Sequence, residues 1–193
     1  MPPLILASTS LYRRTLLERL GVPFTCEAPR CDEEALKDPR LAPQALAEFL
    51  ADAKAASVAA HFPNAIVIGS DQLVACDGAI LGKPGSTSAA VAQLQRLAGR
   101  EHTLITALTV IAPGGVRHRH TDVTRLTMRA LNADALARVV ARDNPIDCAG
   151  AYKLEAGGIS LFARIDSADH TAITGLPLLA LTRILSELDL AIP

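Results

Sequence analysis

Residues 65–76 have the sequence AIVIGSDQLVAC, and this stretch decides the fold. Its near-continuous apolar run predicts a buried central strand, which the polar triplet Ser70-Asp71-Gln72 interrupts. An unpaired carboxylate in such a strand would cost several kcal/mol, so Asp71 requires a cation, hydrogen-bond donors or water at a cleft. Gly69 fits a bulge or a close approach by another chain or ligand. The alternative is that Asp71 merely ends one short strand and begins the next.

The chain starts with a predicted strand, turn and helix, in LILASTSLYRRTLLERLG at residues 4–21. We expect a short buried strand over Leu4–Ala7 and a turn with an N-cap hydroxyl over Ser8–Ser10. Arg13 and Arg14 then fall in the first helical turn, where unpaired N–H groups and partial positive charge disfavour cations. A bound phosphate or carboxylate would resolve this conflict, because helix N-termini and guanidiniums both bind anions. Otherwise the arginines point into water and the serines only cap the helix.

The rest of the chain alternates between strand and helix patterns and contains both hairpins and crossovers. We therefore expect an α/β fold with a mixed, twisted β-sheet and flanking helices. Beyond the first strand and helix, the predicted strands are 24–28, 65–68, 73–76, 79–81, 103–112, 116–128 and 158–165, and the predicted helices are 43–60, 86–99, 132–143 and 177–190.

Composition limits the classes of function. The 193 residues fit one domain, or one domain with two lobes, and half of them are hydrophobic. The net charge of -1 and the lack of a Lys/Arg run argue against a nucleic-acid polymer as partner. There is no apolar run of about 18 residues and no signal-peptide pattern, so we expect a cytoplasmic protein without a membrane partner. The four cysteines lack C-x-x-C or zinc spacing, which favours free thiols over disulfides or a zinc site.

Several charged side chains lie at the ends or margins of predicted elements, from which they can converge on an anion. Lys83 follows a hairpin in ILGKPG, Glu33 belongs to an acidic run in the irregular stretch 29–43, and Lys54 lies at the margin of the apolar stripe of helix 43–60. Each of them alone is more simply a solvated charge. Together they suit phosphate-anhydride chemistry, in which Mg²⁺ takes oxygen ligands. The stripe of the long helix consists of Leu46, Phe49, Leu50 and Ala53.

Seven segments stand out in order across nearly the whole chain: LILASTSLYRR, Asp32-Glu33, Lys54, IGSDQ, GKP, CAGAYKLE and GLPL. They resemble the Maf-type nucleotide pyrophosphatases. The resemblance implies one domain over residues 1–193, with two lobes around a central cleft in a Maf/ITPase-like fold. It also implies hydrolysis of a nucleoside triphosphate to the monophosphate and pyrophosphate, a divalent cation (Mg²⁺ or Mn²⁺) and often a homodimer.

The resemblance also implies roles for particular residues. Asp71 matches the family's catalytic carboxylate, which is taken to activate water, and Ser8 and Ser10 match its phosphate-binding turn. Leu11 departs from the family, which usually has proline there; the change removes no chemical group. The other charged site residues of the family match Arg13, Glu33, Lys54 and Lys83. In these roles Arg13, Arg14, Lys54 and Lys83 would bind phosphates, and Glu33 with Asp71 would hold the metal.

Three positions resemble the family branch that acts on 7-methyl-GTP rather than the branch that acts on dTTP and UTP. They are Tyr12, Gln72 and Glu155, where the pyrimidine branch is expected to have Arg, Thr and Gln. Methylation at N7 makes guanine cationic, and a cation over the face of Tyr12 gains roughly 0.5 to 2 kcal/mol. Glu155 can accept hydrogen bonds from the N1–H and N2–H₂ of guanine. The simpler interpretation is that Tyr12 packs on its own helix and Glu155 is solvated.

Other functions remain open at this point. The chain could be a dTTP/UTP pyrophosphatase of the same family, or a phosphatase that releases single phosphates. It could also be a non-catalytic nucleotide-binding regulator, for instance of cell division. Such a binding module needs the arginines and lysines, but it has no need of Asp71 beside a metal.

Overall fold

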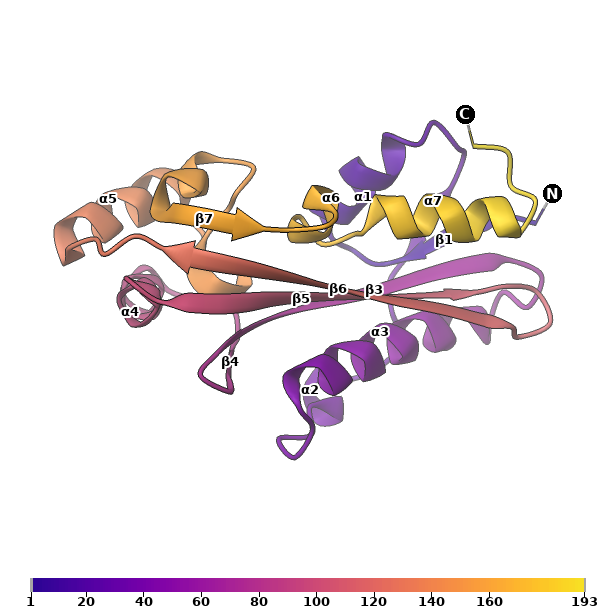
Figure 1. Ribbon diagram of the computed structural model, residues 1–193. Coiled ribbons are helices and arrows are strands. Elements are labelled where there is room, and N and C mark those ends of the chain that lie inside the picture. Colours follow the sequence, from indigo (N-terminus) through magenta and orange to yellow (C-terminus); the bar gives the residue numbers. More distant parts are fainter. Residues whose placement is uncertain (1, 193) are drawn as a thin grey trace. The chain divides into compact units, whose positions relative to one another are not determined.

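The computed structural model describes residues 2–192, and the chain divides into two compact units. The first unit comprises 1–71, 106–122 and 169–193, and the second comprises 72–105 and 123–168. The chain passes from one unit to the other within strands β3, β5 and β6, which Figure 1 labels, and again between Ala168 and Asp169. The strands hydrogen-bond in the order β2-β1-β3-β5-β6-β7, with β4 paired to β3. Their bounds are β1 Leu4–Ala7, β2 Thr25–Glu27, β3 Ile66–Cys76, β4 Ala79–Leu81, β5 Glu101–Ile111, β6 Arg117–Met128 and β7 Phe162–Asp166.

The sheet is mixed, as the sequence predicts. Strand β1 pairs in parallel with both β2 and β3, whereas β3 with β4 and β6 with β7 are antiparallel. The predicted combination of crossovers and hairpins accounts for this mixture, because parallel neighbours need a crossover and antiparallel neighbours need only a turn. The expected α/β fold class is therefore confirmed.

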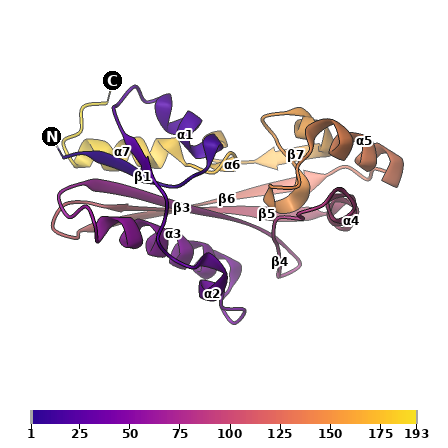
Figure 2. The same ribbon diagram turned by 180° about the vertical axis from the view of Figure 1, so that it is seen from behind.

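In the first unit, helices cover both faces of the sheet (Figures 1 and 2). Successive side chains of β1 point to opposite faces. Leu4 and Leu6 join the core beneath α1 (Leu11–Glu18) and α7 (Leu178–Glu187), while Ile5 and Ala7 join the core beneath α3 (Pro43–Ala59). Burial on both faces explains why β1 and the first half of β3 are apolar throughout.

Gly69 allows α3 to lie unusually close to β3. A Cβ atom at Gly69 would lie 2.5 Å from the carbonyl oxygen of Ala51 and 2.7 Å from the backbone nitrogen of Ala55. Real Cβ atoms essentially never come so near to other atoms. The close approach predicted at this glycine is thus made by the helix backbone of the same chain, and it brings Lys54 of α3 level with the middle of β3.

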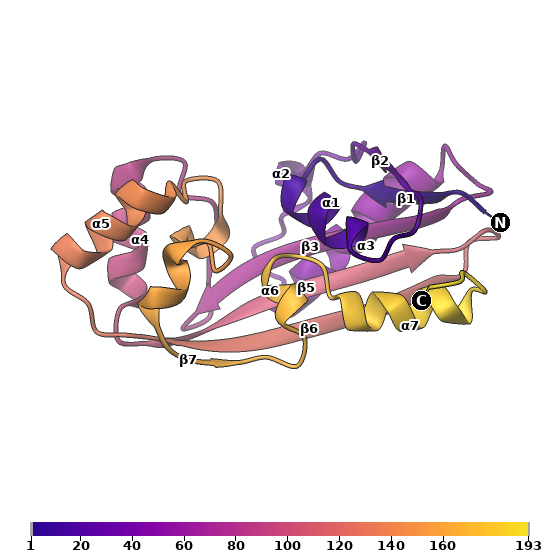
Figure 3. The same ribbon diagram turned by 90° about the horizontal axis from the view of Figure 1, so that it is seen from above.

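In the second unit, α4 (Thr87–Leu97) and α5 (Ala133–Asp143) pack against each other (Figure 3). Both helices begin where the sequence predicts. The Ser86 hydroxyl caps α4 by accepting from the Ala89 N–H at 3.2 Å, and the Asn132 side chain caps α5 by accepting from the Ala135 N–H at 2.9 Å.

Four predictions about elements are wrong. The predicted strands 65–68 and 73–76 are one continuous strand, β3 over Ile66–Cys76, because the carboxylate that interrupts the pattern has its own cation. Segment 158–165 begins as a 3₁₀ helix, η2 (Gly157–Leu161), before β7. Phe49, assigned to the buried stripe of α3, is 44% exposed. Three short helices were not predicted: α2 (Glu33–Leu36), η1 (Ala149–Ala151) and α6 (His170–Ile173).

Two further observations concern the cysteines and the helices. All four cysteines are free thiols, as their spacing predicts. Among the described residues, no helix is both long and apolar enough to cross a membrane.

Candidate active site

The turn between β1 and α1 has the predicted serine-capped geometry. The Ser8 side chain is buried, and its hydroxyl accepts a hydrogen bond from the Ser10 N–H at 3.1 Å. The Ser10 hydroxyl in turn accepts from the Arg13 N–H at 3.4 Å and caps α1. These bonds fix the first turn of the helix, whose N–H groups form an anion-binding end.

Arg13 leaves this turn and is held by a backbone carbonyl from the other end of the chain. Its Nε donates to the Gly175 oxygen at 2.9 Å, and the Ser70 hydroxyl donates to the same oxygen at 2.9 Å. Burial holds the pKa of the Arg13 guanidinium below its ordinary value, against the opposing effect of the negative charges of Asp71 and Glu33. The guanidinium is therefore oriented by one fixed acceptor and lies in the field of both carboxylates.

Lys54 is the centre of the charged group. Its side chain is only 6% exposed, and its Nζ lies 2.7 Å from Asp71 Oδ1 and 2.8 Å from Glu33 Oε2. The sequence prediction placed Lys54 at the margin of the apolar stripe, and this is wrong because α3 buries the residue against β3. Burial of the ammonium is tolerated because two carboxylates neutralise it.

Asp71 lies in the middle of β3 and is almost fully buried. Lys54 supplies the cation that a carboxylate at this position requires, so the alternative of a simple break between two strands is wrong. Only Oδ1 is engaged. The buried Oδ2 accepts no hydrogen bond from any of the residues 2–192, and such an orphaned oxygen calls for a ligand, an ion or a water molecule.

Arg14 does not join this group in the structure. Its Nε lies 2.9 Å from Glu18 Oε1, one helical turn along α1, and both side chains are about half exposed. Tyr12, on the same helix, is partly buried. Of the two neighbouring arginines, Arg13 is therefore the one that the fold directs towards the carboxylates.

The remaining predicted site residues belong to the second unit. Gln72 is partly buried in β3, Lys83 is exposed in the segment after β4, and Glu155 is exposed in a turn. The turn with Glu155 is tight, because the N–H groups of Ala156 and Gly158 both donate to the Lys153 carbonyl oxygen. A Cβ atom at Gly158 would lie 2.5 Å from that oxygen, so glycine is required there.

Sequence reasoning missed the group that holds Gly175. Both oxygens of the buried Asp169 are used: Oδ1 accepts from the N–H and hydroxyl of Thr171, and Oδ2 accepts from the Leu179 N–H at 2.8 Å. The Thr171 hydroxyl also accepts from the Leu178 N–H at 2.8 Å. These bonds brace the segment between α6 and α7, where Gly175 adopts φ +111°. The segment GLPL marks this place in the sequence, but nothing in its pattern indicates a contact with Arg13.

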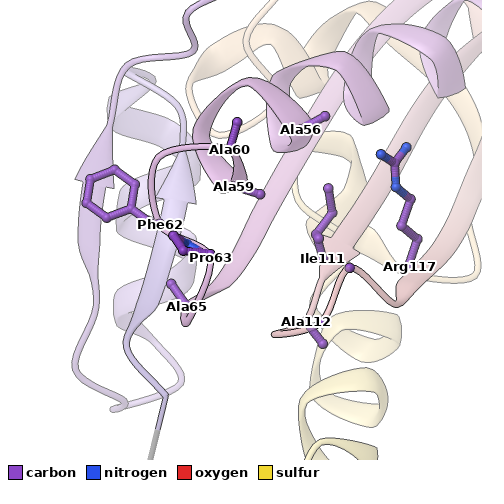
Figure 4. A pocket seen from close by; sticks show the side chains of 11 residues that line it. Ala56, Ala59, Ala60, Phe62, Pro63, Ala65, Ile111, Ala112 and Arg117 are labelled. Carbon is purple, nitrogen blue, oxygen red and sulfur yellow. The ribbon is translucent and has the colours of Figure 1, made fainter.

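A hollow of about 350 Å³ elsewhere in the first unit has no such chemistry (Figure 4). It lies between the C-terminal half of α3 and the turn that joins β5 to β6, and small apolar residues line most of it. Its one charged lining residue, Arg117, forms an ion pair with Asp52. The hollow therefore offers no free charge for phosphate.

Comparison with known proteins gives consistent results. The family model described as Maf-like protein matches residues 3–188. The 7-methyl-GTP pyrophosphatase of Bdellovibrio bacteriovorus is 51% identical over 187 residues, with 97% of each chain covered. The proteins of the same name from Xanthomonas campestris and Aromatoleum aromaticum are 47% and 45% identical, and the alignments cover at least 97% of each chain. The resemblance of the seven segments is thus confirmed, and the chain belongs to the Maf-like protein family.

Proposed function

We propose that this protein is a nucleotide pyrophosphatase that hydrolyses 7-methyl-GTP to 7-methyl-GMP and pyrophosphate. The observation that carries the proposal is the buried Lys54–Asp71 pair, in which one carboxylate oxygen is held by a cation and the other is free. Relatives with 45–51% identity over nearly the whole chain bear the name of this activity. Most buried polar atoms in proteins have a hydrogen-bond partner, so the unpartnered oxygen supports a site that a ligand completes.

The phosphates of the nucleotide are bound by cations and by the end of a helix. The turn Ser8–Ser10 and the N-terminus of α1 present N–H groups, and Arg13 adds a guanidinium with a fixed direction. Lys54 and Lys83 stabilise the charge that develops on the leaving pyrophosphate. Arg14 has an exposed partner in Glu18, so we assign it at most an outer contact with the phosphates.

Asp71 acts on the attacking water. Its Oδ2 accepts a proton from the water as the oxygen bonds to the α-phosphorus, and the bond between that phosphorus and the bridging oxygen breaks, releasing pyrophosphate. In the structure Lys54 donates to Oδ1, and Oδ2 has no partner among the described residues, which leaves Oδ2 for the water. A base positioned in this way typically contributes a factor of about 10² to 10⁴ to the rate.

The residues of this site fit a divalent cation. Glu33 and Asp71 supply carboxylate oxygens around one point, and Asp71 Oδ2 has no partner among the described residues. Two carboxylates suit Mg²⁺, which is commonly held by one or two carboxylates together with substrate phosphates and water. When bound, the cation would neutralise charge on the phosphate oxygens.

The base of the nucleotide is selected by Tyr12, Gln72 and Glu155. The cationic 7-methylguanine ring stacks on Tyr12, and Glu155 accepts from N1–H and N2–H₂, for which its exposed carboxylate is available. The test is the triple variant Tyr12→Arg, Gln72→Thr and Glu155→Gln, which should shift the preference in kcat/KM towards dTTP and UTP. An unchanged preference would show that these residues do not determine specificity. It would leave the proposed reaction untouched.

Product analysis tests the reaction. Purified protein with Mg²⁺ and 7-methyl-GTP should release pyrophosphate and 7-methyl-GMP in equal amounts. Release of single phosphates would instead identify a phosphatase. Tight binding without turnover would identify a nucleotide-binding regulator.

A further inference from the structure

We propose that the Lys54 ammonium and the divalent cation compete for the same two carboxylates, so that Lys54 makes metal binding depend on the nucleotide. This inference rests on the proposed function, because it concerns the carboxylates assigned to the metal. It concerns a separate property, however, namely the affinity of the protein for metal when no nucleotide is present.

The Lys54 ammonium already contacts both carboxylates that are assigned to the metal. Nζ of Lys54 is within 2.8 Å of one oxygen of Glu33 and one oxygen of Asp71. These carboxylates come from α2 and β3, and the ammonium lies where it contacts both. Magnesium binds its oxygen ligands at about 2.0–2.1 Å, so a cation held by these carboxylates would lie close to the ammonium, and the two positive charges would repel each other.

The charges of the four side chains also favour competition between Lys54 and the metal. Asp71 and Glu33 carry two negative charges, and Lys54 and Arg13 carry two positive charges, so this group is neutral without any further ion. Adding a divalent cation alone would leave an excess of two positive charges beside the buried side chains of Lys54 and Asp71. A triphosphate provides several negative charges for Lys54 and Arg13, which frees the carboxylates for the metal.

Lys54, rather than Arg13, is the group that moves. The Arg13 guanidinium is tied to the Gly175 carbonyl, which Ser70 and the braced segment before α7 hold in place. The Lys54 ammonium ends a flexible four-carbon chain, and it is paired with the two carboxylates themselves. Withdrawal of the ammonium therefore requires no change of the backbone.

The direct test measures Mn²⁺ binding by calorimetry without nucleotide. Lys54→Met keeps the length of the side chain and removes its charge, so the variant should bind Mn²⁺ at least about tenfold more tightly than the natural protein. The matched control is Lys37→Met, at an exposed lysine paired with Glu34, which should bind Mn²⁺ like the natural protein. Equal or weaker Mn²⁺ binding by folded Lys54→Met would overturn the proposal.

A second measurement needs no variant, in case Lys54→Met fails to fold. Acetylation of Lys54 in the natural protein, followed by mass spectrometry, should be slow because the ammonium is buried and paired. Saturating Mn²⁺ should accelerate it several-fold, while the labelling of Lys37 stays constant. Unchanged labelling of Lys54 would contradict the proposal. Neither experiment uses a nucleotide, so a failure to hydrolyse 7-methyl-GTP and a failure of this competition are told apart.

Discussion

The two carboxylate oxygens of Asp71 have different surroundings. Oδ1 accepts from the Lys54 ammonium at 2.7 Å, and Oδ2 is buried with no partner among the described residues. One oxygen is therefore paired with Lys54, and the other lacks a partner. A general base must lie within hydrogen-bond reach of the proton that it accepts, and the unpartnered Oδ2 is the oxygen left for this role.

Replacing Asp71 by Asn tests this role. The amide has the same shape but cannot take the proton, so kcat should fall by at least about 100-fold while the nucleotide still binds. Steady-state kinetics would measure the loss of kcat, and nucleotide-binding measurements would show that affinity is retained. Asp77→Asn, at an exposed hairpin residue paired with Arg100, is the matched control and should keep full activity. Near-complete activity of Asp71→Asn would show that Asp71 is not the general base.

The sequence predicts the need for a cation at Asp71 but not the burial of Lys54. A carboxylate inside an apolar strand is costly wherever the strand lies, so the requirement can be stated from local sequence. The depth of Lys54 depends on Glu33, whose helix the sequence did not indicate, and on the close contact of α3 with Gly69. Both are tertiary contacts, which helical periodicity cannot report.

At the scale of elements, the packing of α3 on β3 sets the distance between Lys54 and Asp71. Gly69→Ala should force the two elements apart, because the added Cβ would meet backbone atoms of Ala51 and Ala55 at 2.5 and 2.7 Å. We expect a loss of about 1–3 kcal/mol in the free energy of unfolding, measured in urea, together with reduced kcat. Gly82→Ala, where nothing lies within 4 Å, should change neither. A fully stable and active Gly69→Ala would contradict the assigned role of this contact.

The second unit contains a buried histidine that should make stability depend on pH. Burial lowers the pKa of His102 from 6.5 to about 4. Its Nε2 lies 3.2 Å from the Tyr152 hydroxyl, and its Nδ1 has no partner in 2–192, so a second proton would add a buried N–H without an acceptor. Between pH 6.5 and about 4 the unfolded chain binds this proton and the folded chain does not. The free energy of unfolding should therefore fall as the pH drops through this window.

Urea unfolding at several pH values measures this dependence. The contribution of His102 is at most about 3–4 kcal/mol, since its pKa falls from 6.5 to about 4 on folding and each pKa unit corresponds to about 1.4 kcal/mol. His102→Gln should flatten the slope between pH 6.5 and 4, whereas the same change at the exposed His61 should leave it as in the natural protein. Identical slopes for His102→Gln and the natural protein would show that another group causes the dependence.

Long elements are easier to predict than short ones. The boundaries of β1, α3, α4 and α5 follow from apolar periodicity and from their caps, which are properties of the local sequence. The helices α2 and α6 have four residues each, too few to show a helical period. Segment 158–165 looks like a strand by its apolar content, but its first part coils as η2, where Gly158 packs against the Lys153 carbonyl.

At the scale of the whole molecule, composition and the alternation of elements predict the mixed α/β fold. The division into two units by crossings within three strands does not follow from the sequence, because no linker or shift of composition marks it. The proposed site draws Arg13, Glu33, Lys54 and Asp71 from four elements, α1, α2, α3 and β3, of one unit. Their convergence is a property of the sheet order, which a linear pattern does not contain.

Removal of the metal tests the whole proposed site at once. Activity should disappear on addition of a chelator and return with Mg²⁺ or Mn²⁺ but not with Ca²⁺, because a compact octahedral site excludes the larger ion. Pyrophosphate release in metal-depleted buffer, followed by titration with each ion, is the measurement. Full activity in the presence of excess chelator would exclude a divalent cation from the reaction.

The central claim is that the protein is a pyrophosphatase for 7-methyl-GTP, and the kcat/KM values for pyrophosphate release test it most directly. They should be measured under the same conditions for 7-methyl-GTP, GTP, dTTP and UTP. We expect the highest value for 7-methyl-GTP, exceeding GTP by about 2- to 30-fold if the cationic ring stacks on Tyr12. A higher value for dTTP or UTP, or equal values for GTP and 7-methyl-GTP, would contradict the claim.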